Sequence, residues 1–422
     1  MSKQALLACL LALLVVLPAA AQDTISPALT EQMDALEAYT MRVRGLDEMA
    51  DVSREFPTRQ QLIDYLEAQY SRDLAAADLL KAELLYKGLG MLALDTDLRS
   101  VYLTLLGSQI AGFYDTDTGI MNVIPTVGDD PGSSLSLTEQ AIYVHEYTHA
   151  LQDQHFDLGR LESEELMNAP DQSLALLALV EGDATAVMNL FTQAASVQNP
   201  FAALGMLIEG VQAGNLLLPE GIPPALVREL AFPYEDGLNF VLAVYRAGGW
   251  DAINAAYDNP PTTTEQVIHP EKYLDGEGAL DVSLGDRGLS PGPAWDAVWD
   301  TTLGEFYLRE HLRAGLSRAQ AAQAAAGWGG DRFRLYHQPE TGDIGWVMAI
   351  RWDSDREARE FQRLYPDYAR ARTGSPARGV LGVNCWSGEA ESICWAQDED
   401  EPYTYLSYGT TLDIARGLLA MA

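Results

Sequence analysis

The stretch from Tyr143 to Leu151 constrains this chain most, because it reads His-Glu-x-x-His at positions 145 to 149. On a helix, positions i and i+4 lie on one face, so His145 and His149 would present two imidazoles to one point. Two neutral imidazoles placed in this way suit a tetrahedral Zn²⁺ ion. Glu146 follows the first histidine, where a carboxylate can accept a proton from a metal-bound water. The alternative is a chance match, so the surrounding sequence has to decide.

The residues around the motif predict a buried helix. Ser136 and Glu139 have the spacing of a capping box, which starts a helix just before the motif. Apolar or small side chains then recur at helical spacing, at Ala141, Val144, Thr148 and Leu151. Because a helix that is apolar nearly all round belongs in the interior, two histidines there need partners. This context favours a metal site.

A third ligand is expected, because a catalytic zinc usually has three protein ligands and one open position. The apolar segment from Leu174 to Met188 predicts a second buried helix, interrupted by Glu181, Gly182 and Asp183. A buried carboxylate is costly unless a cation meets it, so Glu181 is the candidate ligand. A buried salt bridge or a helix break at Gly182 is the alternative. Asp183 lies near the opposite face and could orient a histidine from behind the metal.

These motifs resemble those of the gluzincin metallopeptidases, the group that contains thermolysin and the alanyl-aminopeptidase type. In the latter, Asn-Glu-Gly-Phe-Ala carries the third ligand, and Val180–Ala184 matches it here. The resemblance covers roughly residues 110 to 260 and is strong only at the motifs. It implies a zincin-like fold, a Zn²⁺ cofactor and hydrolysis of peptide bonds, with Glu146 as the general base.

The same resemblance implies further residues. The family has a Tyr-x-x-Gly stretch that opens a helix, which matches Tyr234 here and gives this tyrosine the role of donor to the oxyanion. A core tyrosine near a helix start is the alternative. His269, before Pro270, is similar to a transition-state histidine of the membrane-associated and minimal gluzincins. A loop histidine with a structural hydrogen bond explains it as well, so His269 is not part of the predicted site.

The chain also departs from the aminopeptidases. Its segment between His149 and Glu181 is longer, and the sequence lacks Gly-Ala-Met-Glu-Asn, which holds the free amine of the substrate in that family. We therefore expect an endopeptidase. Two apolar runs within residues 110–124 flank a polar turn and predict a β-hairpin. Such a hairpin either binds an extended peptide substrate beside the metal helix or is an ordinary part of a sheet.

The N-terminus predicts export. Lys3, the apolar residues 5–17 and a run of alanines ending at Ala21 have the three regions of a signal peptide cleaved after Ala21. An uncleaved membrane anchor is the alternative, and no other membrane span is predicted. We expect a secreted or periplasmic protein. Cleavage leaves Cys385 and Cys394, whose spacing predicts a disulfide across a hairpin, with two buried thiols as the alternative.

The net charge of −34 argues against nucleic acid as a partner, because binding phosphates requires a surplus of Lys and Arg. A peptide or protein substrate fits the motifs better. The oligomeric state has no signal in the sequence.

The predicted fold class is α+β, with a zincin-like core, a helical N-terminal lead-in and a small C-terminal α+β domain. The lead-in shows no cluster of polar residues. The predicted parts are a signal peptide (1–21), a helical N-terminal region (22–106), the catalytic domain (107–290), a helical segment (291–336) and the C-terminal domain (337–422). The periodicity predicts helices at 58–70, 75–92, 295–327, 355–365 and 412–421 and strands at 346–352, 380–383, 393–397 and 403–408.

The prediction is an exported zinc metallopeptidase. Two alternatives stay open: another zinc-dependent hydrolase that acts on esters or other amides, and a non-catalytic exported protein with a structural zinc. The intact Glu146 beside the first histidine argues against the second.

Overall fold

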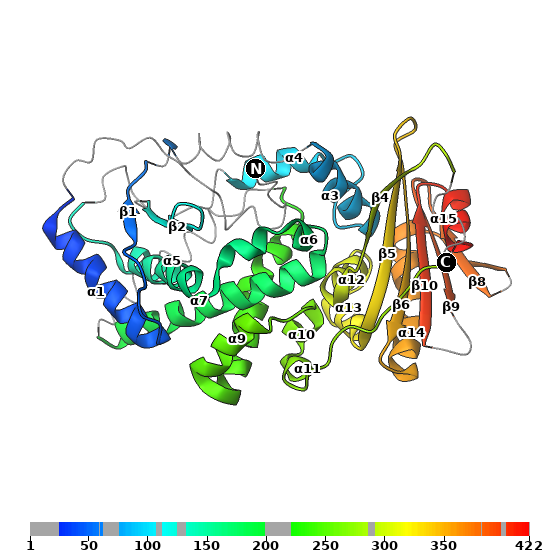
Figure 1. The fold of residues 1–422 in the computed structure, drawn as a ribbon. Helices are drawn as coiled ribbons and strands as arrows, with labels where there is room; N and C mark the ends of the chain where they lie inside the picture. The colour runs from blue at the N-terminus through cyan, green and yellow to red at the C-terminus, as the bar shows by residue number, and fades with distance from the viewer. Residues whose placement is uncertain are drawn as a thin grey trace.

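The computed structural model describes residues 25–58, 60–61, 76–106, 112–124, 132–198, 221–285, 292–380, 382–397 and 402–421. The predicted signal peptide and most of the helix predicted at 58–70 lie outside these residues. The chain is mixed α and β, as predicted. Helices gather in the N-terminal part and a large sheet forms in the C-terminal part (Figure 1).

Helices dominate the N-terminal part. They are α1 (Pro27–Arg44), α3 (Ala76–Leu89), α4 (Leu98–Leu106), α5 (Leu137–Phe156), η1 (Leu158–Glu162), α6 (Glu164–Met167), α7 (Pro170–Gln198), α9 (Pro224–Asp258), α10 (Thr264–Ile268) and α11 (Pro270–Leu274). A small sheet beside them contains β1 (Ser53–Glu55), β2 (Gly112–Asp115) and β3 (Ile120–Val123), in the order β1-β3-β2. The strands β2 and β3 are the predicted hairpin. The strand β1 falls in a region predicted to be helical, and it is held by parallel pairing with β3.

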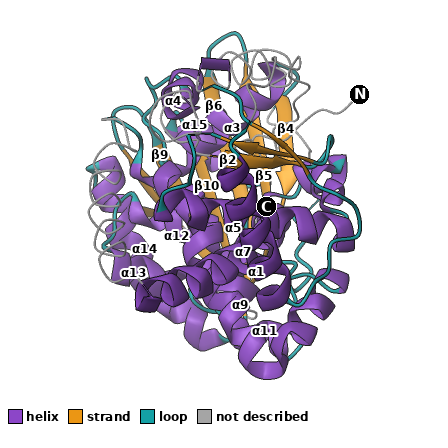
Figure 2. Cartoon of the chain, turned by 90° about the vertical axis from the view of Figure 1, so that its left-hand side faces the viewer, coloured by secondary structure: helices purple, strands orange, loops and turns teal. Residues whose placement is uncertain are grey.

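The large sheet of the C-terminal part, here called the C-terminal sheet, has the strand order β4-β5-β6-β10-β9-β8-β7, and its neighbours run antiparallel. Its strands are β4 (Asp296–Thr301), β5 (Trp328–Gln338), β6 (Asp343–Trp352), β7 (Arg378–Val380), β8 (Val383–Ser387), β9 (Ser392–Gln397) and β10 (Tyr403–Gly409). The helices of this part are α12 (Gly304–Arg313), α13 (Arg318–Ala325), α14 (Asp355–Thr373) and α15 (Leu412–Leu419). In Figure 2 many of the helices lie in front of this sheet.

Two predictions for the C-terminal part were wrong. The helix predicted at 295–327 is a strand, β4, followed by two short helices, because pairing with β5 outweighs the local helical pattern. Residues 380–383 were predicted to form one strand. Instead, β7 ends at Val380 and β8 begins at Val383, and Gly382 between them has a positive φ of 81°. The strands predicted at 346–352, 393–397 and 403–408 lie within observed strands, and helices α14 and α15 occupy the other two predicted places.

The predicted cysteine hairpin is present. Cys385 of β8 and Cys394 of β9 are direct partners across the two antiparallel strands. Their sulfur atoms lie 1.99 Å apart, at disulfide distance. Both residues are buried against α15, so the pair joins β8 to β9 beneath this helix.

One hydrophobic core runs through both parts of the chain. It contains Leu85 of α3, Phe240 of α9 and Trp346 of β6, each 1% exposed or less. The indole nitrogen of Trp346 also donates a hydrogen bond to the carbonyl of Gly88, 2.9 Å away. The C-terminal sheet therefore packs on the helices rather than standing apart from them.

Helix α7 is buried along most of its length. Among the described residues it is the one helix long and apolar enough to cross a membrane, judged by length and composition alone. However, 78% of that apolar stretch is buried inside the protein. Packing between α5 and α9 accounts for its apolar sequence.

Two glycines set how closely α7 and α9 approach. A Cβ atom added to Gly182 of α7 would lie 2.3 Å from the carbonyl oxygen of Gly237 in α9. A Cβ atom added to Gly237 would lie 2.3 Å from the carbonyl oxygen of Ala178. The two backbones therefore touch at this crossing, one residue away from Glu181 and three residues away from Tyr234. Helix α9 then kinks at Gly248 and Gly249, whose backbone angles are not helical.

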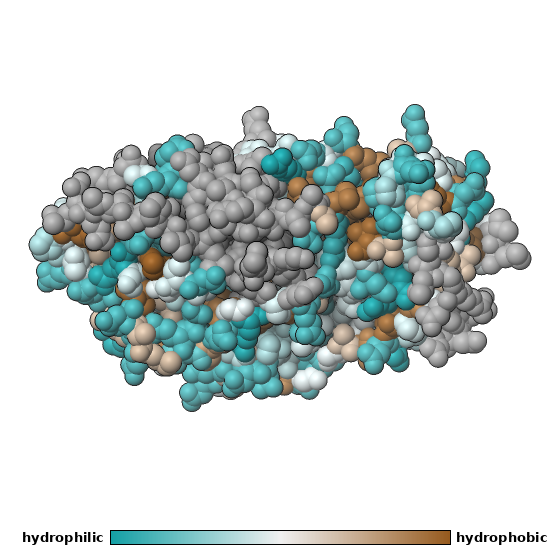
Figure 3. All heavy atoms as spheres, turned by 45° about the horizontal axis from the view of Figure 1, so that its top comes forward, coloured by the Kyte–Doolittle hydropathy of each residue, from teal (hydrophilic) through white to brown (hydrophobic). Residues whose placement is uncertain are grey.

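Hydrophilic side chains cover most of the described surface seen in Figure 3, with smaller hydrophobic areas between them. This agrees with the large net charge of −34.

Candidate metal centre

The helix that carries His-Glu-x-x-His forms as predicted. Ser136 caps α5, with its hydroxyl accepting from the Glu139 backbone while the Glu139 carboxylate accepts from the Ser136 backbone. The helix is buried on several faces, and His145 and His149 are only 6% and 7% exposed. The spacing of four residues brings their rings together, with 4.7 Å between the ring centroids.

The structure brings Glu181 of α7 to the two histidines. Its carboxylate oxygens lie 3.1 Å from Nε2 of His145 and 3.4 Å from Nε2 of His149. The two Nε2 atoms lie 3.1 Å from each other. One ligand atom from each residue lies within 4.8 Å of the others, and all three residues are buried. The three predicted ligands thus form one cluster.

The distances within this cluster fit a tetrahedral metal. Ligand atoms about 2.0–2.2 Å from Zn²⁺ in tetrahedral geometry are separated from one another by about 3.3–3.5 Å. The observed separations of 3.1 to 3.4 Å are close to this before any adjustment. Two imidazoles and one carboxylate are also a common donor set for catalytic zinc. The residues present therefore fit the ion that the sequence predicts.

Hydrogen bonding fixes the ring of His149. Its Nδ1 lies 2.8 Å from the side-chain oxygen of Gln152, one turn further along α5. The amide nitrogen of Gln152 donates to Val180 O and to Asp183, so the amide oxygen must face the ring. Nδ1 of His149 therefore carries a proton and donates it to Gln152. This directs Nε2 into the cluster, as a metal ligand requires.

His149 and Glu181 shift each other's pKa. Burial alone would lower the pKa of His149, but the adjacent Glu181 carboxylate outweighs it and raises the pKa to about 9. Burial alone would raise the pKa of Glu181, but the two histidines outweigh it and lower the pKa to about 2. A positive charge between these groups is therefore favoured, and a divalent metal would replace the proton.

Glu146 lies at the junction of α5 and the small sheet. One of its carboxylate oxygens accepts a hydrogen bond from the backbone N–H of Tyr114 in β2, at 3.0 Å. Burial raises the pKa of Glu146, and the charges of the two histidines offset part of that rise. Such a carboxylate accepts a proton more readily than an exposed one. The other end of Tyr114 is fixed to α5 through a hydrogen bond from its hydroxyl to Asp153, at 3.0 Å.

Tyr234 also reaches the cluster. It lies in α9, whose first helical residue is Pro224, so it sits within the helix rather than at its opening. Its ring stacks against that of His145, with 6.1 Å between centroids. Burial raises the pKa of Tyr234 well above its usual value, and the charges of Glu181 and Glu146 and a hydrogen bond to Glu181 raise it further. The tyrosine therefore stays protonated and can donate a hydrogen bond.

Asp183 supports the centre from behind. It does not touch a histidine directly, but it holds Gln152, which holds His149. Its carboxylate also accepts from the hydroxyl of Tyr257, at 3.0 Å, and forms an ion pair with Arg44 of α1, at 2.8 Å. The sequence prediction did not include Gln152 or Arg44 in the site. The spacing of Gln152, three residues after His149, could have indicated it.

The N-terminal helices were predicted to have no cluster of polar residues, but Arg44 of α1 takes part in one. It is the last residue of α1 and is fully buried, although the helix was predicted only to pack on the catalytic unit. No local pattern marks it, because its partner lies 139 positions away along the chain.

The other histidines lie outside the centre. His269 pairs with Glu305 of α12, at 3.1 Å, so its ring is held by a structural ion pair. His155 contacts the carbonyl of Asp47, at 2.7 Å. His311 is buried in the C-terminal part, with Nδ1 3.0 Å from the carbonyl of Leu89. His337 lies on β5.

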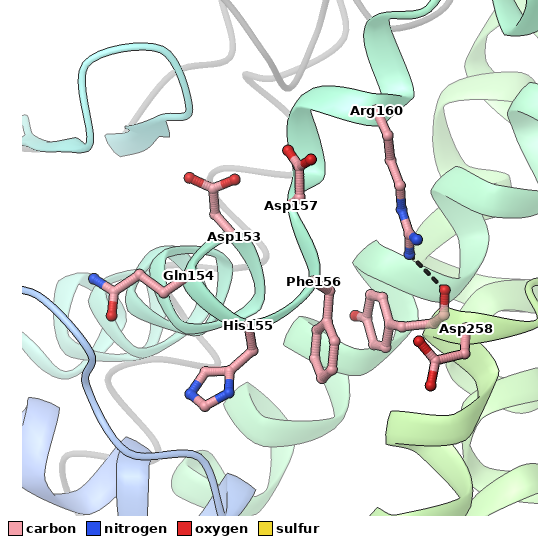
Figure 4. Close-up of a pocket in the computed structure, with 8 residues that line it drawn as sticks. Asp153, Gln154, His155, Phe156, Asp157, Arg160 and Asp258 are labelled. Carbon is pink, nitrogen blue, oxygen red and sulfur yellow. Dashed lines mark hydrogen bonds between the residues drawn. The ribbon is translucent and has the colours of Figure 1, made fainter.

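A separate cavity of about 270 Å³ lies at the C-terminal end of α5. Three aspartates line it, together with Arg160, whose guanidinium donates to the carbonyl of Tyr257 at 2.6 Å (Figure 4). Its lining includes none of the cluster residues. It is therefore distinct from the candidate metal centre.

Residues 295–413 match a family model described as "Domain of unknown function (DUF8575)". The match covers the C-terminal sheet with helices α12, α13 and α14 and ends at the start of α15, and it contains no residue of the candidate centre. No curated protein matches the chain, and no solved structure matches it.

Proposed function

We propose that this chain is an exported zinc metallopeptidase with a zincin-like core, and that it cleaves within peptide chains. The observation that supports this most is the convergence of His145, His149 and Glu181 from two helices, with Glu146 beside them. Three ligands leave one tetrahedral position for water or substrate. The resemblance of the motifs to the gluzincins points to the same activity.

A bound Zn²⁺ would act as a Lewis acid and lower the pKa of a coordinated water to about 7. The residues of the chain supply the remaining chemistry. Glu146 accepts the proton of the attacking water, and its raised pKa suits that task. It then donates the proton to the nitrogen of the leaving amine, which completes the cleavage of the amide bond.

Tyr234 is proposed to donate a hydrogen bond to the oxygen that becomes negative during attack. Its hydroxyl interacts with the Glu181 carboxylate, which helps to raise the pKa of Tyr234. If Glu181 held a metal, this hydroxyl would be free to donate to the substrate oxygen. Its position in α9 is fixed by the contact between Gly182 and Gly237.

The strand β2 is proposed to hold the substrate. It pairs with β3 along one edge, and within the described residues no strand pairs with its other edge. The Tyr114 N–H on β2 already points to Glu146, so β2 runs directly beside the proposed base. An extended peptide could add to this edge by main-chain hydrogen bonds, which suits cleavage within a chain.

The variant Glu146→Gln tests the catalytic part. It should bind one zinc, as the wild type does, but lose at least about 100-fold in casein hydrolysis, because the general base is gone. The control is Glu31→Gln, an exposed site on α1, which should keep full activity. Hydrolysis by Glu146→Gln at the wild-type rate would contradict the assigned role.

Zinc binding and the hydrolysis of casein and esters by the wild type distinguish the alternative functions. A protein that cleaves a panel of esters but not casein would be a different zinc hydrolase. A protein that binds zinc and hydrolyses neither would be a binding protein with a structural metal. For the enzyme, activity should disappear with a chelator and return with added zinc. Sequencing the N-terminus of the exported protein tests cleavage after Ala21.

A further inference from the structure

We propose that Arg44 of the N-terminal helix α1 is a positioning residue for the metal centre, acting through Asp183 and Gln152 on His149. The inference rests on the proposed function, because it concerns how the chain prepares a metal ligand. Helix α1 then has a part in the site, although Arg44 lies 139 positions before Asp183 in the sequence.

Arg44 is held on three sides. Its Nε donates to both carboxylate oxygens of Asp183, at 2.8 and 3.0 Å. Its Nη2 donates to the side chain of Asn254, at 2.8 Å, and its guanidinium lies 4.7 Å from the ring of Trp250. Both side chains of the ion pair are 0% exposed. A guanidinium fixed in this way has no alternative partner in solvent.

Asp183 needs this charge. The hydrogen bonds from Tyr257 and Gln152 come from neutral groups and would stabilise a buried carboxylate only in part. Arg44 is the cation that contacts it directly. Both carboxylate oxygens of Asp183 therefore accept hydrogen bonds, one from Arg44 alone and the other from Arg44, Gln152 and Tyr257.

Asp183 in turn fixes the amide of Gln152. The amide nitrogen donates to Asp183 and to Val180 O, both at 3.1 Å. The reversed amide would put its oxygen against these two acceptors, which is unfavourable. The amide oxygen is thus directed to Nδ1 of His149, and Nε2 is left for the metal. Three consecutive contacts connect the end of α1 to a metal ligand.

This chain of contacts has a consequence for α1. Removing the helix would leave a buried carboxylate without its cation and would free the Gln152 amide to turn. Helix α1 is therefore part of the active centre of the working protein, not a segment to be discarded before activity.

The test is zinc affinity, measured by competition with a chelator on the full-length mature chain. Arg44→Met keeps the length of the side chain but removes the charge, and it should weaken zinc binding about 10- to 100-fold, as loss of a ligand's support does. The control Arg54→Met removes another N-terminal arginine, which pairs with Asp34 and Glu37. It should leave zinc affinity within about twofold of the wild type, because none of its partners touches a ligand.

A second pair of variants tests the route. Asp183→Asn should weaken zinc binding by a similar factor, and adding Arg44→Met to it should change affinity little further, because both act through one contact. The visible spectrum of the cobalt-substituted protein gives a readout of ligand geometry. It should change in Arg44→Met and stay unchanged in Arg54→Met.

The outcomes are distinguishable. A wild type that binds no zinc would refute the proposed function, and the inference with it. A wild type that binds zinc while Arg44→Met matches it in affinity and cobalt spectrum would overturn the inference alone. If Arg44→Met does not fold, Arg44→Lys keeps the charge but cannot contact Asp183 and Asn254 together. Its zinc affinity should fall about three- to tenfold, and an unchanged affinity would again overturn the inference.

Discussion

Replacing Gly182 by alanine should damage both the fold and the metal centre. The added methyl group would lie 2.3 Å from the carbonyl oxygen of Gly237. The closest favourable approach of carbon to a carbonyl oxygen is about 3.3 Å, so α7 and α9 must separate by about 1 Å. Since the atom met is backbone and not a flexible side chain, relaxation is limited. We expect a loss of about 3 kcal/mol in the free energy of unfolding, at the upper end for overpacked sites.

The same separation should weaken the centre. Glu181 precedes Gly182 on α7, and Tyr234 lies on the helix that would be pushed away. Bonds to zinc tolerate only about 0.2 Å of change, so a shift of about 1 Å should reduce zinc affinity tenfold or more. Unfolding in urea gives the stability, and chelator competition gives the affinity.

A matched control makes the result decisive. Gly417 lies in α15, and a Cβ atom there would meet nothing within 4 Å. Gly417→Ala should be neutral or stabilise by up to about 1 kcal/mol, through helix propensity alone. If Gly182→Ala behaved like this control in both stability and zinc affinity, the close crossing of the two helices would not be what positions the centre.

Three further outcomes follow from the structure. Under the proposed mechanism, Tyr234→Phe should lower kcat by about 100-fold or more while zinc content and stability stay near wild type, because only the proposed donor to the oxyanion is lost; an unchanged kcat in a peptide-cleavage assay would refute the role. Burial raises the pKa of Glu229 to about 7, and hydrogen bonds from two tyrosine hydroxyls offset only part of this. Its contribution to stability is therefore fully present at acid pH and is lost as the pH rises from about 4.5 to 7, by up to about 3 kcal/mol. Urea unfolding at pH 5 and pH 8 should show that Glu229→Gln removes this loss, and an equal pH dependence in variant and wild type would argue against it. Replacing Cys385 and Cys394 by serine should cost about 3 kcal/mol from loop entropy, and a reductant should then have no further effect on unfolding; a wild type insensitive to the reductant would show that no bond is present.

The centre could be predicted from sequence because its signals are local. The spacing of His145 and His149 fixes their common face on a helix, and the apolar surroundings of Glu181 make its carboxylate conspicuous. The capping box at Ser136 gave the start of the helix to the residue. Each of these signals follows from helix geometry or from the cost of burying a charge.

Other features depend on contacts between segments that are far apart in the sequence. Local sequence patterns do not reveal which of these segments meet. Arg44 is buried through partners on α7 and α9, which lie far from it in the sequence. In the sequence, Gly182 looked like a motif residue or a helix break. In the structure, it allows the backbone of α7 to contact Gly237 of α9. The strand β4 forms because β5 offers an edge to pair with, although its residues also fit a helix.

The N-terminal helices and the C-terminal sheet share one hydrophobic core, so cutting the chain between them should disturb both parts. The boundary predicted at 290–291 lies between elements that pack into one another, and Asp171, on the first turn of α7, lies against Gly304 at the start of α12 with no room for a side chain there. Asp171 also accepts from Thr264, whose hydroxyl accepts from the backbone of Phe306. A fragment that stops at residue 290 would therefore expose the flank of the helix that carries Glu181. We expect such an excised fragment to aggregate. The segment that matches the family model would then be required for the rest of the chain to stay folded.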